Sequence, residues 1–241
     1  DVNVYVGGVM KDGDWELQRD MVKELPGKKA DAVILAPADS SNMTASAKTL
    51  REQKLPVFLV DTALSSNDYD AAFLTDNLEA GAEVCQQMVE QMKASGVKES
   101  EEATVLVHVS TLASTTISDR LNSIMANWGK FASASWKIEH DYIINYGDEA
   151  GAFKLVTEKI KNTHNVKGII ACNNGSTNAT VEAVMAAGRK DIVVTGFDLG
   201  KKTLLGLEDK NYSIAVAVQN QYKMGLSLIH ISEPTRPEPI S

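Results

Sequence analysis

Short apolar runs alternate with longer amphipathic segments along most of the chain. A continuous apolar run, such as ADAVILA at residues 30–36, is typical of a strand that is buried on both faces of a parallel sheet. Runs of this kind predict strands at residues 1–6, 30–36, 55–60, 71–75, 104–109, 136–144, 166–171, 192–195 and 213–218. The intervening segments predict helices at residues 15–25, 42–53, 78–95, 117–128, 148–162, 176–187 and in the stretch before 207. Strand and helix alternate throughout, which predicts an α/β fold of two doubly wound parallel sheets.

The stretch from Ile192 to Gln219 indicates where such a fold would hold a ligand. A buried strand ends at Thr195, and a tight Gly-Phe-Asp turn places Asp198 just beyond it. The next strand ends directly before Gln219. Open α/β sheets bind small ligands at the carboxyl ends of neighbouring strands, so we expect Asp198 and Gln219 to face a ligand.

Composition and charge exclude several classes of protein. The 241 residues are 44% apolar, which suits a globular chain with one large or two ordinary α/β domains. With 24 basic and 32 acidic residues, the net charge of -8 argues against a nucleic-acid partner. No apolar run in the sequence reaches the roughly 18 residues of a membrane span.

No pattern in the chain indicates catalysis, a cofactor or a metal site. The segment GFDLGKKT at residues 196–203 lacks the glycine spacing of a phosphate loop, and the chain has no nucleophile elbow or dinucleotide fingerprint. The histidines are scattered without metal-ligand spacing. Cys85 and Cys172 show neither a metal nor a disulfide pattern, so we expect both to be small buried apolar residues. These observations favour a binding protein over an enzyme.

Three motifs carry a resemblance to a known family. They are TDNLEAG at residues 75–81, the Gly-Phe-Asp turn at 196–198, and QNQYKMG at 219–225. In these motifs and their order, the chain from residue 1 to about 225 resembles the periplasmic binding protein type I superfamily, in particular the ribose/galactose-type sugar-binding proteins of ABC transporters. Gln221 departs from the pattern, because members of the family usually have proline there.

The resemblance implies two Rossmann-like lobes joined by a hinge. Residues 1–108 would form the N-terminal lobe, 109–219 the C-terminal lobe, and 220–225 the return to the first lobe. Within TDNLEAG, we interpret Gly81 as the residue that lets a capped helix lie close to the sheet.

The resemblance also implies a set of polar residues that would hold a sugar. A sugar hydroxyl both donates and accepts hydrogen bonds, so a sugar site combines carboxylates, amides and a guanidinium between apolar walls. The residues at the matching positions are Asp61, Arg120, Asn173, Asp198 and Gln219. Arg120 would offer its planar fork to the ring oxygen and a hydroxyl, and Asp61 would accept from two adjacent hydroxyls. The alternative for Asp61, Asn173 and Asp198 is a structural role in turns and helix caps.

Two further residues complete the candidate set. Tyr146 is a candidate for stacking on the sugar, with an exposed loop aromatic as the alternative, because Glu149 occupies the aligned place of the second-lobe aromatic. Thr62 stands where ribose-type members often have arginine, which removes a hydrogen-bonding fork and a charge. The ligand therefore need not be ribose.

Both ends of the chain depart from the family. Residues 1–6 correspond to the second strand of the N-terminal lobe, so we expect the first strand and helix to be missing, together with part of the stacking surface. The segment LSLIHISEPTR at residues 226–236 looks like the in-frame translation of a transposase adapter used in sequencing libraries. We therefore interpret residues 226–241 as a non-native tail, with a native proline-rich terminus as the alternative.

The predicted function is that of an extracytoplasmic solute-binding protein. It would capture a monosaccharide or related polyol between its lobes and deliver it to an ABC permease. We expect a monomer in the periplasm, or an extracellular lipoprotein on the cell surface, whose signal peptide is lost by truncation. The alternatives that share this fold are the ligand-sensing core of a lactose-repressor-type transcriptional regulator and that of a membrane receptor kinase.

Overall fold

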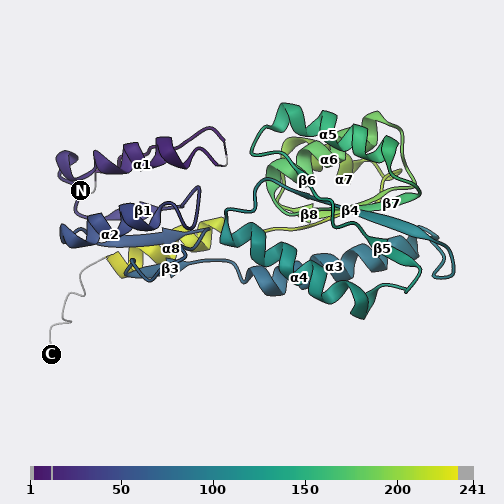
Figure 1. Cartoon of the computed structure of the whole chain (residues 1–241), viewed down its shortest axis with the longest axis horizontal. Coiled ribbons are helices and arrows are strands. Elements are labelled where there is room, and N and C mark those ends of the chain that lie inside the picture. Colours follow the sequence, from purple (N-terminus) through teal and green to yellow (C-terminus); the bar gives the residue numbers. More distant parts are fainter. Residues whose placement is uncertain (1–2, 12, 233–241) are drawn as a thin grey trace.

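The computed structural model describes residues 3–11 and 13–232, and its strands form two separate parallel sheets (Figure 1). The first sheet has the order β1-β2-β3, with bounds Val33–Leu35, Val57–Val60 and Ala71–Phe73. The second has the order β5-β4-β7-β8-β9, and β6 also pairs with β4. Its strands are β4 (Ala103–Val109), β5 (Trp136–Ile138), β6 (Ile143–Ile144), β7 (Val166–Ala171), β8 (Val193–Phe197) and β9 (Ile214–Ala217). All these pairs are parallel, which confirms the predicted α/β fold.

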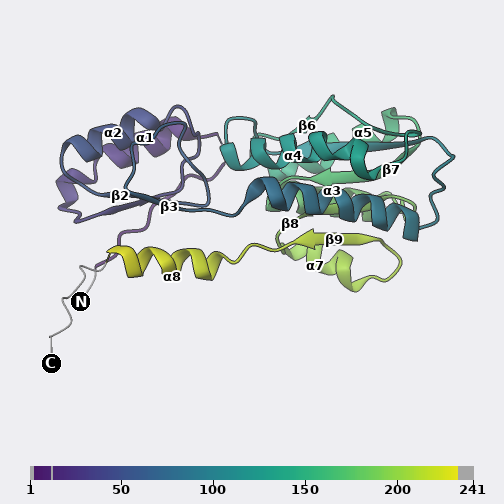
Figure 2. The ribbon, with the colours of Figure 1, turned by 90° about the horizontal axis from the view of Figure 1, so that it is seen from below.

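Helices cover both faces of each sheet, because apolar strands of this kind must be buried on both sides. Figure 2 shows α1 and α2 on one side of the first sheet and α8 on the other. In the second unit, α3 and α4 lie on one side of the sheet and α5, α6 and α7 on the other (Figure 1). The helices are α1 (Trp15–Lys23), α2 (Thr44–Glu52), α3 (Asn77–Ala94), α4 (Thr115–Phe131), α5 (Glu149–Asn162), α6 (Asn174–Ala186), α7 (Lys201–Glu208) and α8 (Gln221–Ser232), with a 3-10 turn at Pro26–Lys28.

Within residues 13–232 the chain passes between the two units twice, and the first passage lies elsewhere than predicted. The sequence analysis assigned residues 1–108 to the first lobe, whereas β4 pairs with β5, β6 and β7 in the second sheet. Helix α3 also belongs to the second unit, since it buries Val84, Met88 and Met92 in the same core as β4 and α4. The first passage is therefore at residues 74–76, and the second is at 218–220, before α8 packs on β2 and β3.

Two of the predicted strands differ from the structure. Residues 3–6 belong to no strand, and Val4, Tyr5 and Val6 stay 75%, 71% and 93% exposed, because the alternating pattern there has no hydrogen-bonded neighbour among the described residues. The predicted strand at 136–144 is split into β5 and β6 by a polar bend. Of the predicted non-native tail, residues 226–232 continue α8, and 233–241 lie outside the described residues.

Gly81 permits a close approach of two helices. A Cβ atom at this position would lie 2.7 Å from the backbone oxygen of Arg120 and 2.9 Å from Cβ of Ser123, both on α4. The close neighbour is thus α4, not the sheet as the sequence analysis expected. The contact fixes the backbone of Arg120, one of the predicted site residues.

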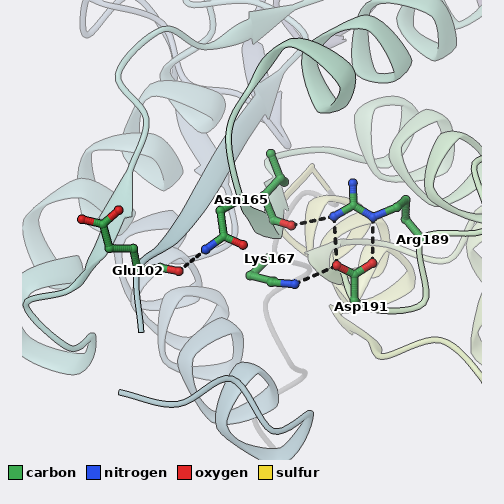
Figure 3. Close-up of polar contacts among 6 residues, drawn as sticks. Glu102, Asn165, Lys167, Arg189 and Asp191 are labelled. Carbon is green, nitrogen blue, oxygen red and sulfur yellow. Dashed lines mark hydrogen bonds and ion pairs between the residues drawn. The ribbon is translucent and has the colours of Figure 1, made fainter. Parts of the chain in front are cut away.

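Polar side chains interact with one another at the amino ends of β4, β7 and β8 in the second sheet (Figure 3). Asp191 accepts hydrogen bonds of 2.7 and 2.9 Å from Arg189, and Lys167 on β7 lies 2.9 Å away. The Arg189 guanidinium, together with Lys167, holds the pKa of the Asp191 carboxyl well below its usual range. The Asn165 side chain donates to the backbone oxygen of Glu102, which ties β7 to β4. The strands are therefore held together at the edge opposite to their carboxyl ends.

The substitution Gly81→Ala is expected to lower the free energy of unfolding by about 1–3 kcal/mol, because the added methyl group forces α3 and α4 apart. The matched control is Gly129→Ala, also in a helix, where a Cβ atom would meet nothing within 4 Å. There the gain in helix propensity should raise stability by about 0.5–1 kcal/mol. Urea denaturation measures both changes, and effects of the same sign and size would contradict the close contact.

Candidate functional site

A cavity of about 680 Å³ runs along α1 and β1 of the first unit and continues into the space between the two units, at the carboxyl ends of both sheets. Apolar walls come from β1, β2 and α1, and a polar wall comes from the loops that follow β2, β7, β8 and β9. The structure brings six of the seven predicted residues to this cavity, namely Asp61, Thr62, Arg120, Asn173, Asp198 and Gln219. Tyr146 does not line it and is 65% exposed, so the alternative of a surface loop aromatic describes it.

Arg120 lies at the centre of the polar wall and is only 1% exposed. Its Nε donates to Oδ1 of Asn77 at 2.9 Å, and its Nη1 donates to the backbone oxygen of Cys172 at 2.9 Å. The guanidinium stacks on Phe197, with its carbon 4.0 Å from the ring centre. Burial lowers the pKa of Arg120, and the charges of Asp198 and Asp61 act in the opposite direction. The side chain stays cationic, as arginine does in proteins.

Two buried polar atoms in this wall have no partner. Within the described part of the chain, the buried side-chain atoms without a hydrogen bond include Nη2 of Arg120 and Oδ1 of Asn173. Asn173 precedes α6, but its side chain makes no capping bond, so the alternative of a helix-cap role is not what the structure shows. A buried polar group without a partner is unfavourable by about 1–3 kcal/mol, so both atoms favour a ligand that completes them.

Asp198 and Gln219, which follow β8 and β9, are hydrogen-bonded to each other. Nε2 of Gln219 donates to both carboxylate oxygens of Asp198, at 3.2 and 3.0 Å. Oε1 of Gln219 accepts from the hydroxyl of Thr75 at 2.8 Å. A carboxylate can only accept, and a hydroxyl donates here, so both neighbours fix the same orientation of the Gln219 amide. The pair also connects the two passages between the units.

Asp61 stands at the end of β2 in a left-handed conformation, with φ at 65°. Its carboxylate accepts from the hydroxyl of Thr62 at 3.1 Å, and its backbone oxygen accepts from the hydroxyl of Thr116 at 2.7 Å. Residues with branched side chains rarely adopt this conformation, whereas aspartate tolerates it. The backbone thus turns sharply at Asp61, which lines the cavity.

The sequence analysis missed three residues that support the site: Thr75, Asn77 and Thr116. The motif TDNLEAG was interpreted as a capped helix start, and Asp76 does accept from the backbone N–H of Glu79 at 3.0 Å. Asp76 alone caps the helix, so the polar residues Thr75 and Asn77 on either side of it are not needed for capping. Their presence was the signal in the sequence that could have identified them. Thr75 instead holds Gln219, and Asn77 holds Arg120.

A buried network fixes the start of α6, and with it Asn173. Nδ1 of His108 lies 2.9 Å from Oγ1 of Thr180, and its Nε2 lies 2.9 Å from Nδ2 of Asn145. The same Asn145 amide donates to Oγ of Ser176 at 3.0 Å. Burial lowers the pKa of His108 to about 3, so the ring is neutral at pH 7.

Both cysteines are buried and have free thiols. Cys85 and Cys172 are both 0% exposed, which confirms the prediction that they are buried, and burial raises the pKa of each thiol to about 12. In residues 3–11 and 13–232, no group of three or more His, Cys, Asp and Glu side chains is placed to hold a metal ion. None of the helices described there combines the length and the hydrophobicity that crossing a membrane requires.

One known family matches almost the whole chain. The family described as periplasmic binding protein domain matches residues 2–232. The chain belongs to this periplasmic binding protein family. The resemblance predicted from the three motifs is thereby confirmed.

Two curated relatives are similar to the chain at low identity. The D-apiose import binding protein of Actinobacillus succinogenes is 23% identical over 188 residues, which are 78% of this chain and 57% of that protein. The ribose import binding protein RbsB of Bacillus subtilis is 21% identical over 206 residues, which are 86% of this chain and 63% of that protein. The chain thus spans less than two thirds of the length of either relative.

Solved structures of the periplasmic binding protein family share the fold. A carbohydrate transporter solute-binding protein from Agrobacterium radiobacter in complex with D-arabinose has a TM-score of 0.82 and 21% identity, over 92% of this chain and 73% of that one. An ABC transporter solute-binding protein from Agrobacterium vitis with bound D-fucose has a TM-score of 0.82 and 22% identity, over 95% and 79%. At these identities the likeness establishes the fold.

The neutral His108 predicts a pH dependence of stability. Its folded pKa lies below its usual value of 6.5, so the unfolded chain binds the extra proton first as pH falls. Stability contributed by the neutral ring is complete above about pH 6.5 and is lost toward pH 3, at about 1.4 kcal/mol per pH unit. Urea titrations at several pH values should show a slope that is steeper, by this amount, in the unsubstituted chain and in the control His140→Gln than in His108→Gln, where the carboxylates alone contribute. The same slope in all three proteins would contradict the assignment.

Proposed function

We propose that this chain captures a neutral monosaccharide or polyol in the cavity between its two units and releases it unchanged to an ABC permease. The observation that carries the proposal is the pair of unpartnered buried atoms, a donor on Arg120 and an acceptor on Asn173. A hydroxyl group donates and accepts at once, so a polyol supplies partners for both. The carboxylates of Asp61 and Asp198 line the same cavity as further acceptors.

The charges in the cavity favour a neutral ligand. Two carboxylates, Asp61 and Asp198, stand around one buried guanidinium, so the polar wall is negative; the other cation of the lining, Lys28, is at the end of the 3-10 turn in the first unit. Gln219 already donates to Asp198, which leaves the carboxylate able to accept from hydroxyl groups of a ligand. An acidic sugar would bring a third carboxylate into this wall and be repelled.

The setting of the site in the cell is part of the proposal. The relatives are named for import of apiose and ribose, which favours transport over gene regulation or kinase signalling. Family membership supports an extracytoplasmic location and an ABC permease as the partner. We further propose a monomer, attachment as a lipoprotein or release into the periplasm, binding without catalysis, and hinge movement of the two lobes about the passages at 74–76 and 218–220.

A panel titration tests the proposal. Calorimetry of the chain with D-ribose, D-arabinose, D-fucose, D-galactose, allitol and D-galacturonate is expected to show binding of at least one neutral compound, with galacturonate weaker than galactose. Asn173→Ala should weaken the best ligand by about 10–100-fold, because it removes a buried acceptor that the sugar completes. The matched control Asn211→Ala, at an exposed turn, should bind as the natural chain does.

Two outcomes of this titration would contradict the proposal. One is the absence of binding by every neutral compound in a folded sample. The other is equal affinity of Asn173→Ala and the natural chain for the compound that binds best.

A further inference from the structure

Three loops from the two units meet beside the cavity through hydroxyl groups. Two of the loops belong to the first unit: residues 36–43 follow β1, and residues 61–65 follow β2. The third belongs to the second unit and leads from β4 into the first turn of α4, at residues 110–116. The side chains that join them are Ser40 from the first unit and Thr115 and Thr116 from the second. We call these three residues the hydroxyl latch.

Ser40 is the first-unit half of the latch. Its Oγ accepts from the backbone N–H of Thr115 at 2.9 Å and donates to Oγ1 of Thr115 at 3.3 Å. Its backbone N–H donates to the oxygen of Ala113 at 3.0 Å. Ser40 is 2% exposed, so these contacts are shielded from water.

The loop that carries Ser40 is held in place from within the first unit. The carboxylate of Asp39 accepts from the backbone N–H of Ser41 at 2.9 Å and of Asn42 at 2.7 Å. Gln18 on α1 donates to the oxygen of Ala36 and accepts from the backbone N–H of Ala38, both at 2.8 Å. The loop therefore presents Ser40 as a fixed feature of the first unit.

Thr115 and Thr116, at the start of α4, reach back to the loop after β2. Oγ1 of Thr115 donates to the oxygen of Ala63 at 3.2 Å, and Oγ1 of Thr116 donates to the oxygen of Asp61 at 2.7 Å. Thr116 is 5% exposed. Because Asp61 has a left-handed backbone, the bond from Thr116 fixes the peptide that orients its carboxylate.

We propose that the hydroxyl latch holds the two units together in the absence of sugar, and that Thr116 is the positioning residue for Asp61. The latch contacts are neutral hydrogen bonds that water can replace when the units separate. The contact between the units is therefore reversible. It determines the fraction of molecules in which residues of both units surround the cavity. The apparent affinity for a ligand that needs both units is proportional to the fraction of molecules in which the two units are in contact. It therefore falls when that fraction falls. This last consequence rests on the proposed function, whereas the contact itself does not.

Distances between spin labels test the latch without any ligand. Labels at Lys48→Cys on α2 and Lys154→Cys on α5 lie on opposite units, and the natural thiols Cys85 and Cys172 are buried. Ser40→Ala and Thr116→Val should each shift the distance distribution of the ligand-free protein toward separated units. Thr116→Ser keeps the hydroxyl and should restore the natural distribution.

The control for this experiment is Thr157→Val. Oγ1 of Thr157 donates to the oxygen of Phe153 within α5, so its loss removes a similar bond away from the latch. Its distribution should equal that of the natural chain. Unchanged distributions in both Ser40→Ala and Thr116→Val, with the folded state verified by circular dichroism, would overturn the proposal.

The positioning role of Thr116 is tested by affinity for the sugar that binds best in the panel. Thr116→Val should weaken binding by about 3–10-fold, and Thr116→Ser should restore it. In an Asp61→Ala background, Thr116→Val should weaken binding less than it does in the natural chain, because part of its effect acts through Asp61. An equal effect in both backgrounds would overturn the positioning role. If no sugar binds while the label distances shift, the latch stands and the proposed function fails.

Discussion

Arg120 carries a positive charge into the interior of the molecule, and the surrounding elements are arranged to keep that charge solvated by protein groups. A buried cation is unfavourable unless nearby dipoles and counter-charges replace water. Here Asn77 at the start of α3 and the oxygen of Cys172 at the end of β7 accept from it, and Phe197 at the end of β8 stacks on it. Gly81 lets α4 come close enough for this set to form. One nitrogen of the guanidinium, Nη2, is buried without a hydrogen-bond partner, and Arg120 lines the cavity.

The rest of the site follows from the parallel sheets. The carboxyl end of β2 in the first sheet and those of β7, β8 and β9 in the second face the same cavity, so the residues just beyond them converge there without being close in sequence. The hydrogen bonds from Thr75 to Gln219 and from Gln219 to Asp198 then join both passages between the units to one carboxylate of the cavity, that of Asp198. A movement of either passage would therefore change the positions of Gln219 and Asp198, and in the proposed function this connects hinge movement to binding.

Most of the strands and helices were predictable from the sequence, because apolar runs and the residues that end them are local features. Six of the seven candidate site residues, named from strand ends and from the family resemblance, line the cavity. The sheet to which a given strand belongs was not predictable from local features. The apolar run of β4 fits either sheet, and only its pairing with β5, β6 and β7 and the packing of α3 decide. The alternating pattern at residues 1–6 has the same limit, since a strand needs a partner that the pattern does not contain. Thr75 and Asn77 were missed because their partners, Gln219 and Arg120, are remote in sequence.

The most direct measurement is a nitrogen-15 NMR titration of arginine side chains with the neutral sugar that binds best, with the Arg120 signals assigned by the loss of resonances in Arg120→Lys. The account predicts that the Nη2 protons of Arg120 shift and exchange more slowly with water as the sugar saturates, since the ligand supplies their missing acceptor. Saturation of the protein with sugar while the Arg120 signals remain unchanged would contradict it, because the ligand would then bind elsewhere.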